Sequence, residues 1–248
     1  MCAACAALLL GAATAHAQLY ASWGYNAEQY ARTDLRIVQP SQGNDFTLHG
    51  LAAHDNKGWT DIFRHQTTVP QYSVRIGWFL PRARDWAVEL NFEHARYMVT
   101  QKQHVQLTGL LDGERANTDV LISSHVLTFW MNNGANFLLV NAVRRVSLVG
   151  ARDRTGSISL LLKAGVGALF PHAQNQVFAE NNAAGFQFGG VDAGIEAALR
   201  LHVFRGLYLD AGEKGVFGRY RGIKVSDGHA DLNVWAHNTS LSFGWQWK

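Results

Sequence analysis

Ser240-Leu241-Ser242-Phe243-Gly244-Trp245-Gln246-Trp247, next to the C-terminus, is the stretch that decides the fold. Its large apolar residues take every second position, and small or polar residues fill the positions between them. Successive side chains of a β-strand point to opposite faces, so this alternation predicts a strand with one apolar and one polar face. An edge strand of a soluble sandwich could alternate in the same way. Four large apolar residues at the end of a chain are, however, typical of the closing strand of an outer-membrane barrel.

Seven further segments can be read as strands, and most of them alternate like the last one. They cover about residues 19–26, 72–80, 86–93, 137–146, 158–168, 191–200 and 207–225. The segments 137–146 and 207–225 are less regular, and β-bulges are one physical reason for such breaks. The sequence therefore predicts an all-β fold, an eight-stranded antiparallel up-and-down transmembrane β-barrel.

The connections between these segments alternate in length. Short turns lie at about 81–85, 147–156 and 204–206, and longer stretches lie at about 27–70, 100–124, 171–184 and 226–230. Bacterial barrels combine short periplasmic turns with longer outer loops. We therefore expect a long first extracellular loop at 27–70. Within it, Leu35–Val38 and Phe46–His49 predict an extra hairpin.

Charged residues fall mainly on the face of each strand opposite the large apolar residues. An eight-stranded barrel has an interior just wide enough for side chains to fill. Because both signs are mixed, we expect a plug of ion pairs rather than the water channel of a wider porin. The expected inward-facing charges are Arg75, Glu89, Glu93, Lys163, Asp192, Glu196, Arg200, Asp210 and Lys214.

The first 17 residues contain no Lys, Arg, Asp or Glu, and they end in Ala15-His16-Ala17. This apolar segment with a small-x-small ending predicts a signal peptide at 1–17, followed by a barrel domain at 18–248. A transmembrane anchor is the competing interpretation, but the apolar run is too short to span a bilayer. Cys2 and Cys5, the two cysteines of the chain, both lie in this segment. The exported chain is therefore expected to lack thiols and disulfides.

Composition agrees with a protein of the Gram-negative outer membrane. Charged residues make up only 17% of the chain, and no stretch after Ala17 has about 18 consecutive apolar residues, as a helical span needs. The net charge of +3 is too small to indicate nucleic-acid binding. We expect a monomer whose partners are outer-membrane lipid and lipopolysaccharide.

Three histidines fall at the outer ends of predicted strands. His94 follows Trp86 by eight residues and His237 precedes Trp247 by ten, offsets that correspond to a height of roughly 20 to 25 Å in a tilted strand. This places both rings near the outer-leaflet headgroups, and His172 occupies a corresponding position. Glu93 is expected to face inward beside His94. The alternative is that histidine is simply tolerated at a membrane interface.

Another group of candidate ligands lies in the long first loop. His49, His54 and Asp55 are residue types that bind metals, but they lack tight ligand spacing. A solvated loop is therefore the default interpretation there.

Several short motifs together resemble the lipid A oxidase-like outer-membrane barrels of α-proteobacteria. They are Leu35–Pro40, Asp45–His49, Pro70–Arg75, Phe92–His94, Asn133–Ala142 with Arg144, Gly165–Gly167, Pro171-His172 and Ala236-His237. The resemblance implies an eight-stranded OmpA-like barrel. It also implies oxygen-dependent oxidation of the proximal glucosamine of lipid A, with a divalent metal as cofactor. Two positions depart from the pattern: Glu213-Lys214 brings together charges expected apart, and Arg96 stands where a Lys is expected.

These observations favour an outer-membrane enzyme that modifies lipid A in the outer leaflet. His94, His172 and His237 would act as metal ligands or acid–base groups, and Glu93 would orient or support them. A non-catalytic barrel with a structural or surface-binding role is the first alternative. A lipid A deacylase using Ser124 and His125 is the second, although adjacent residues of a strand point to opposite faces.

Overall fold

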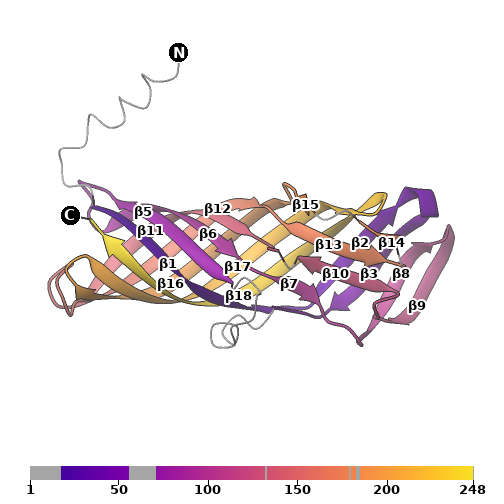
Figure 1. Cartoon of the computed structure of the whole chain (residues 1–248), viewed down its shortest axis with the longest axis horizontal. Coiled ribbons are helices and arrows are strands. Elements are labelled where there is room, and N and C mark those ends of the chain that lie inside the picture. Colours follow the sequence, from indigo (N-terminus) through magenta and orange to yellow (C-terminus); the bar gives the residue numbers. More distant parts are fainter. Residues whose placement is uncertain (1–17, 56–70, 132, 179, 183–184, 248) are drawn as a thin grey trace, which may run out of the picture.

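The chain folds almost entirely into antiparallel strands that follow one another along a long cylinder (Figure 1). The computed structural model describes residues 18–55, 71–131, 133–178, 180–182 and 185–247; the predicted signal peptide at 1–17 lies outside them. No helix in these ranges is long and apolar enough to cross a membrane. The elements are β1 Gln18–Tyr30, β2 Thr33–Gln39, η1 Pro40–Gln42, β3 Asn44–Leu51, β4 Ala53–His54, β5 Tyr72–Phe79, β6 Trp86–His94, β7 Tyr97–Val99, β8 His104–Leu111, β9 Glu114–Leu121, β10 Leu127–Met131, β11 Phe137–Val149, β12 Ile158–Leu169, β13 His172–Val177, β14 Glu180–Asn181, β15 Gly185–Phe186, β16 Gly190–Phe204, β17 Leu207–Val225 and β18 Gly228–Gln246.

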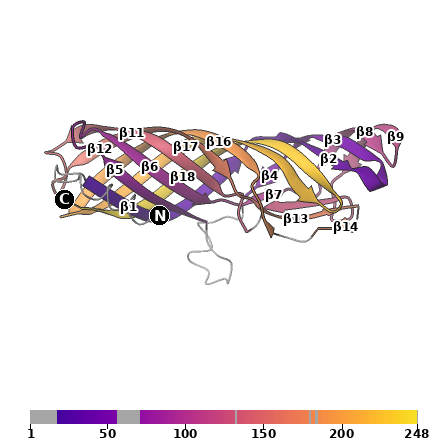
Figure 2. The ribbon, with the colours of Figure 1, turned by 90° about the horizontal axis from the view of Figure 1, so that it is seen from above.

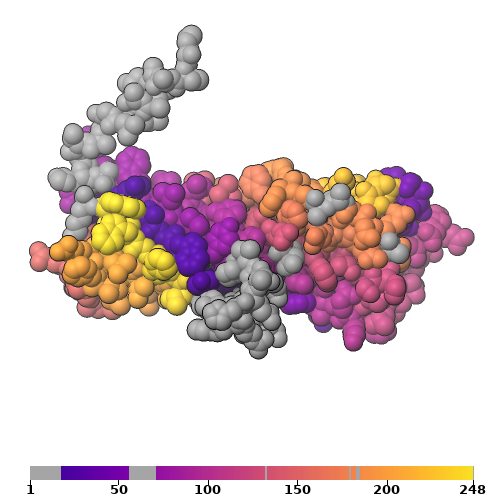
Figure 3. Space-filling view, in the orientation of Figure 1, coloured from indigo at the N-terminus to yellow at the C-terminus, as the bar shows by residue number. Residues whose placement is uncertain are grey.

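Strand pairing runs in a ring through the eight segments that the sequence predicts as strands. Its order is β1-β5-β6-β11-β12-β16-β17-β18, and β1 also pairs with β18. In this pairing Tyr20 lies opposite Gln246 and Tyr30 lies opposite Ala236. The first and last strands are therefore paired from residue 20 to residue 30 of β1. In Figure 3 these strands are the indigo and yellow surfaces that meet near the end holding the C-terminus. This end is called proximal below, and the opposite end distal.

The predicted number of eight strands is too low for this sheet, which contains twelve. At the distal end β18 continues past β1 and pairs with β2 through His229–Leu232, and β3, β8 and β9 follow in order. The predicted hairpin in the first long loop is β2 and β3 and is confirmed. The segment 100–124, by contrast, was expected to be a connection and forms the hairpin of β8 and β9.

A second, six-stranded sheet packs against the distal part of the first (Figure 2). It holds the short strands β14, β13, β10, β7, β4 and β15. The two sheets enclose a large apolar core to which Leu35, Phe46, Leu107, Phe129 and Tyr220 belong. This distal sandwich is the place where the chain buries most of its apolar surface, as a globular domain would.

Burial alternates along most of each ring strand and separates an inner from an outer face. In β6, Ala87, Glu89, Asn91 and Glu93 are buried, and the residues between them face outward. The outer face is apolar, with aliphatic side chains between aromatic ones near the two ends. Its exposed members include Trp78, Trp86, Phe204, Trp245 and Trp247 at the proximal end, Phe170, Phe186, Phe188 and Trp235 toward the distal end, and Ile76, Val88, Leu90, Val140, Leu162, Val166, Ile195, Leu199, Leu209 and Leu241 between them.

Paired charges fill the inside of the ring. All nine charged residues predicted to face inward are buried, and eight of them form ion pairs. Lys163 Nζ lies 3.1 Å from Glu89 Oε1 and 3.0 Å from Glu196 Oε1. The further pairs are Arg75–Glu196 at 2.7 Å, Lys214–Glu93 at 2.5 Å and Arg200–Asp210 at 2.8 Å. The ninth residue, Asp192, is buried, and its carboxylate makes no hydrogen bond within the described ranges.

Candidate functional site on the outer wall

Glu93 belongs to the interior and not to a site on the outer wall. Its side chain is 1% exposed and forms ion pairs with Lys214 and Arg75. His94, the next residue, points to the other face of β6, as strand geometry requires. The expectation that Glu93 faces inward is therefore confirmed, and a direct role beside His94 is not supported by its contacts.

His94 is held at the distal end of β6 by two neighbours. Its ring stacks on Tyr72 with centroids 5.1 Å apart, and its Nδ1 lies 3.0 Å from Asn136 Oδ1. The Asn136 amide also donates to the Phe170 carbonyl oxygen at 2.9 Å. These contacts join the ends of four ring strands, β5, β6, β11 and β12, which gives His94 a structural explanation.

His172 lies nearby but outside the ring. The sequence places it at the end of a ring strand, whereas β12 ends at Leu169 and His172 begins β13 of the second sheet. Its backbone N–H donates to the Gly134 carbonyl oxygen at 2.9 Å, and its ring packs edge-on against Phe186 at 4.8 Å. His94 and His172 thus share the 134–136 segment as a neighbour, but no contact between described residues joins the two rings.

His237 lies apart from the other two histidines and has an acidic partner. Its Nε2 is 2.9 Å from Glu213 Oε2, and the Thr239 hydroxyl donates to the same oxygen at 2.9 Å. Glu213 is on β17, whose residues 213 and 215 pair with 239 and 237 of β18. The side chains of His237 and Glu213 are 55% and 56% exposed, so this group stands open on the outer face. We call Glu213, His237 and Thr239 the wall site.

The wall site interrupts a surface that is otherwise apolar on these two strands. Leu209 and Ala211 precede Glu213 on the outward face of β17, and Phe217 follows it. On the outward face of β18, Trp235 lies distal to His237, and Leu241 lies proximal to Thr239. From the strand rise and tilt, Glu213 and His237 lie roughly 5 to 10 Å proximal to the aromatic pair Phe217–Trp235. A carboxylate on an apolar wall loses hydration, so it needs a partner and points to a function.

Sequence reasoning found His237 but missed Glu213. The signal was present, because Glu213 shares the outward parity of Leu209, Ala211 and Phe217. We interpreted Glu213-Lys214 only as a departure from a family pattern, and the irregularity of 207–225 obscured the parity. A charged residue at an outward position between apolar residues would have identified Glu213 as a candidate site residue.

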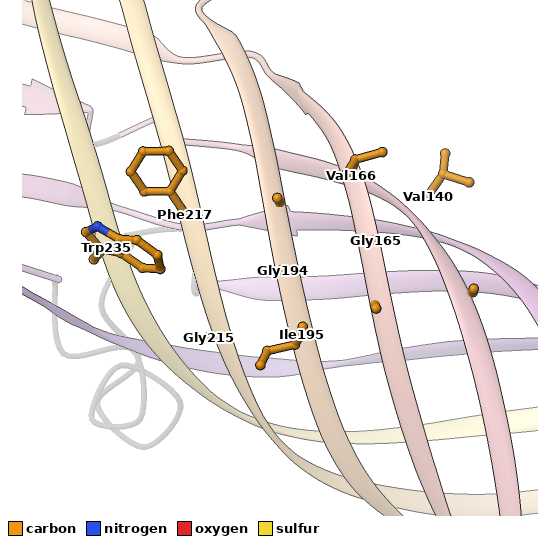
Figure 4. A pocket seen from close by; sticks show the side chains of 11 residues that line it. Val140, Gly165, Val166, Gly194, Ile195, Gly215, Phe217 and Trp235 are labelled. Atoms are coloured by element: carbon orange, nitrogen blue, oxygen red, sulfur yellow. The ribbon is translucent and has the colours of Figure 1, made fainter.

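Shallow grooves run along the wall and meet at this site. One of them, of about 720 Å³, crosses β11, β12, β16, β17 and β18 (Figure 4). Its floor is made by small residues such as Ala142, Ala164, Ala193 and Gly215, and Ile195, Phe217 and Trp235 stand at its sides. A second groove of about 450 Å³ shares Ile195 and Gly215 with the first and is lined by Glu213 and His237. Neither His94 nor His172 lines it.

The residues do not fit the divalent metal that the family resemblance implies. Across the described ranges, no group of three or more His, Cys, Asp or Glu side chains is arranged to hold a metal ion. In the distal sheets, His49 contacts Asp34 and Thr108, His54 contacts Thr100, and Asp55 accepts from the Glu28 backbone. These candidate ligands thus have separate partners.

Comparisons with known proteins find similarity only among solved structures. No protein-family model matches the chain, and no curated protein sequence matches it. Neisserial surface protein A is 10% identical, with 92% of this chain and 96% of that chain covered and a TM-score of 0.38. The attachment invasion locus protein Ail of Yersinia pestis is 12% identical, with coverages of 94% and 99% and a TM-score of 0.36. The outer membrane protease OmpT of Escherichia coli is 8% identical, with coverages of 93% and 96% and a TM-score of 0.39. All three are outer-membrane β-barrel proteins. These TM-scores are low, so we draw the function from this chain's own residues.

Proposed function

We propose that this protein is an outer-membrane β-barrel that modifies lipid A at the wall site. The ring of eight strands is the membrane barrel, its outer face meets the acyl chains, and the distal sandwich lies outside the cell. The offset of ten residues from Leu207 to Phe217 corresponds to roughly 25 Å of height in a tilted strand, about the thickness of a barrel's apolar band. Interior ion pairs make this a plugged barrel rather than a pore.

The observation that carries the enzymatic proposal is the carboxylate–imidazole pair on the membrane wall. A barrel that only stabilised the envelope would gain from an aliphatic residue at position 213, since a charge there costs free energy in lipid. Glu213 instead lies 2.9 Å from His237 Nε2 and accepts a hydrogen bond from Thr239, and a groove for an apolar chain adjoins them. A carboxylate beside an imidazole is an arrangement used for general acid–base catalysis.

Hydrolysis of an ester-linked acyl chain is the reaction that this pair fits best. In this reaction His237 carries its proton on Nε2, beside Glu213, and presents the lone pair of Nδ1. That nitrogen takes a proton from water as the water oxygen attacks the ester carbonyl carbon. The bond to the sugar oxygen then breaks, and the imidazolium returns the proton to that oxygen. The products are a fatty acid and a free sugar hydroxyl, and Glu213 stabilises the transient imidazolium.

The depth of the wall site supports the acyl ester over the sugar as the reacting group. Glu213 and His237 lie below the aromatic pair, where the acyl chains of the outer leaflet begin. The oxidation of the proximal glucosamine, which the family resemblance implies, is the alternative reaction. It would require an oxidant that the hydrolysis does not need.

The test is the mass of lipid A from a Gram-negative host that exports the full chain. Loss of one acyl chain is expected with the natural sequence and is expected to vanish in His237→Ala and Glu213→Gln. The matched controls His94→Ala and His172→Ala should retain activity. Gain of one oxygen would replace hydrolysis by oxidation. Unchanged lipid A, or activity lost in His94→Ala but kept in His237→Ala, would refute the wall site as the active site.

A further inference from the structure

Positive charges line the outer face of β17 directly beyond the aromatic pair. Arg219 and Arg221 continue the outward parity of Phe217, and a bulge then shifts the register between Tyr220 and Ile223. Gly222, with φ of +65°, makes that bulge possible and keeps Lys224 on the outer face. Arg219 lies about 6.6 Å along the strand from Phe217. The cations therefore start where the apolar band ends.

These cations lack acidic partners. No hydrogen bond or ion pair in the described part of the chain engages the side chain of Arg219 or Lys224. Arg221 donates only to neutral oxygens, at 2.8 Å to Asn233 Oδ1 and at 2.6 and 3.1 Å to two carbonyls.

The nearby carboxylates are already engaged. Asp231 accepts the Gly222 N–H at 2.8 Å, and Asp45 pairs with Arg36 at 2.8 Å. His229 lies opposite Lys224 on β18. Residues 219–225 of β17 hold three cations and no carboxylate, so this end of the strand carries net positive charge.

An apolar groove continues from this patch toward the wall site. It passes Phe217 and Trp235, whose rings lie 4.7 Å apart, and follows the small residues Ala164 and Ala193 (Figure 4). Guanidinium groups bind phosphate oxygens in charge-assisted pairs, and a groove between large residues accepts an acyl chain. A molecule that could bind the cations and the groove at the same time is one with a phosphate group joined to acyl chains.

We infer that Arg219, Arg221 and Lys224, together with the groove beneath Phe217 and Trp235, bind a lipid that carries an anionic phosphate. The phosphate lies against the three cations, and one acyl chain follows the groove. This inference rests on the proposed orientation in the outer membrane and names the chemistry by which the wall site recognises its substrate.

Native mass spectrometry of the purified full chain tests the inference without relying on catalysis. The protein is offered equal amounts of phosphatidic acid and phosphatidylcholine with identical acyl chains. The natural sequence should retain phosphatidic acid preferentially, and Arg219→Ala with Lys224→Ala should reduce that preference about tenfold. The control Arg82→Ala with Arg84→Ala removes equal charge at the proximal turn and should preserve it. Equal loss in both double variants, or no preference in the natural sequence, would overturn the cationic site.

Two further arms separate the parts of the inference. Ala164→Phe fills the groove and should lower retention of both lipids, whereas Val88→Phe, on the wall outside the groove, should not; equal behaviour of the two would overturn the acyl-chain part. An excess of inorganic phosphate should leave retention of phosphatidic acid unchanged, and displacement would show a site for free anions instead. Failure of lipid A modification with retained phosphatidic acid preference would refute the proposed enzyme alone.

Discussion

Arg75 Nη1 lies 2.7 Å from Glu196 Oε1 inside the ring, and both side chains are at most 2% exposed. Glu196 also faces Lys163 at 3.0 Å and Lys214 at 3.7 Å, so one carboxylate serves three cations. A buried ion pair that loses one partner leaves an uncompensated charge in a low-dielectric interior. Glu196 is therefore the residue on which the plug depends most.

Glu196→Gln is expected to lower the free energy of unfolding by about 3–5 kcal/mol, because three buried cations then share two carboxylates, Glu89 and Glu93. Urea unfolding in lipid vesicles, followed by tryptophan fluorescence, measures the change. The control Asp119→Asn removes a carboxylate that is 62% exposed and should change the value by less than about 1 kcal/mol. Equal losses in the two variants would contradict a plug that stabilises the barrel.

Substitution by alanine is expected to destabilise the protein at Gly77 and to have little effect at Gly215. A Cβ added at Gly77 would lie 2.1 Å from Tyr20 Cζ, and Tyr20 is fixed by its hydrogen bond of 2.9 Å to Glu89. A Cβ at Gly215 would meet no atom within 4 Å. Gly77→Ala should cost about 1–3 kcal/mol or more through overpacking, and Gly215→Ala should cost less than about 1 kcal/mol. The same unfolding assay measures both, and a reversed order would show that Tyr20 can move aside.

Phe129→Ala should open the distal sandwich while leaving the ring folded. Phe129 is fully buried against Tyr97 between the two sheets, and truncating such a side chain costs about 3–5 kcal/mol. Limited proteolysis should cut the sandwich faster, while the electrophoretic shift of the folded barrel on heating persists. Phe186→Ala, which removes a ring that is 70% exposed, is the control and should not change the cutting rate. Loss of the heat-dependent shift would mean that sandwich and ring fold as one unit.

Much of the ring could be predicted from alternation, because each of its strands has one apolar and one polar face. The paired interior of Lys163 and Glu196 followed from the same parity. The hairpin of β8 and β9 could not be found in this way, since most of β9 is exposed and carries no alternation.

The candidate site was only half predictable for a related reason. His237 could be identified as a histidine on the outward face of its strand. Its partner Glu213 lies on a neighbouring strand, and the register between two strands cannot be derived from the sequence of either strand alone. In the sequence, His94 and His172 occupy the same kind of position as His237, at the outer end of a predicted strand. Their different surroundings depend on the 134–136 segment, whose fold no periodicity describes.

Acid should weaken the distal hairpin of β2 and β3 slightly. The hydrogen bond from Arg36 lowers the pKa of Asp45, and both groups are about half exposed. A lowered folded-state pKa means that the stabilisation is present above the unfolded value of about 3.9 and is lost as the pH falls below it. The effect should stay under about 1 kcal/mol. Arg36→Ala should raise the pKa of Asp45 in an NMR titration. A constant Asp45 pKa would rule out the pair in solution.

Replacing the whole wall site by apolar residues should make the protein more stable and inactive. Glu213→Leu, His237→Leu and Thr239→Val together remove every polar group of the site, so that none is left without a partner in lipid. A charged side chain on the lipid face of a barrel costs free energy that depends on its depth, and a gain of at least about 1 kcal/mol is expected on its removal. Ile195→Leu, on the neighbouring strand, is the control and should change neither property. If the triple variant is less stable than the natural sequence, the three side chains stabilise the pairing of β17 with β18. Their presence on the lipid face would then have a structural reason and would no longer support a role in catalysis.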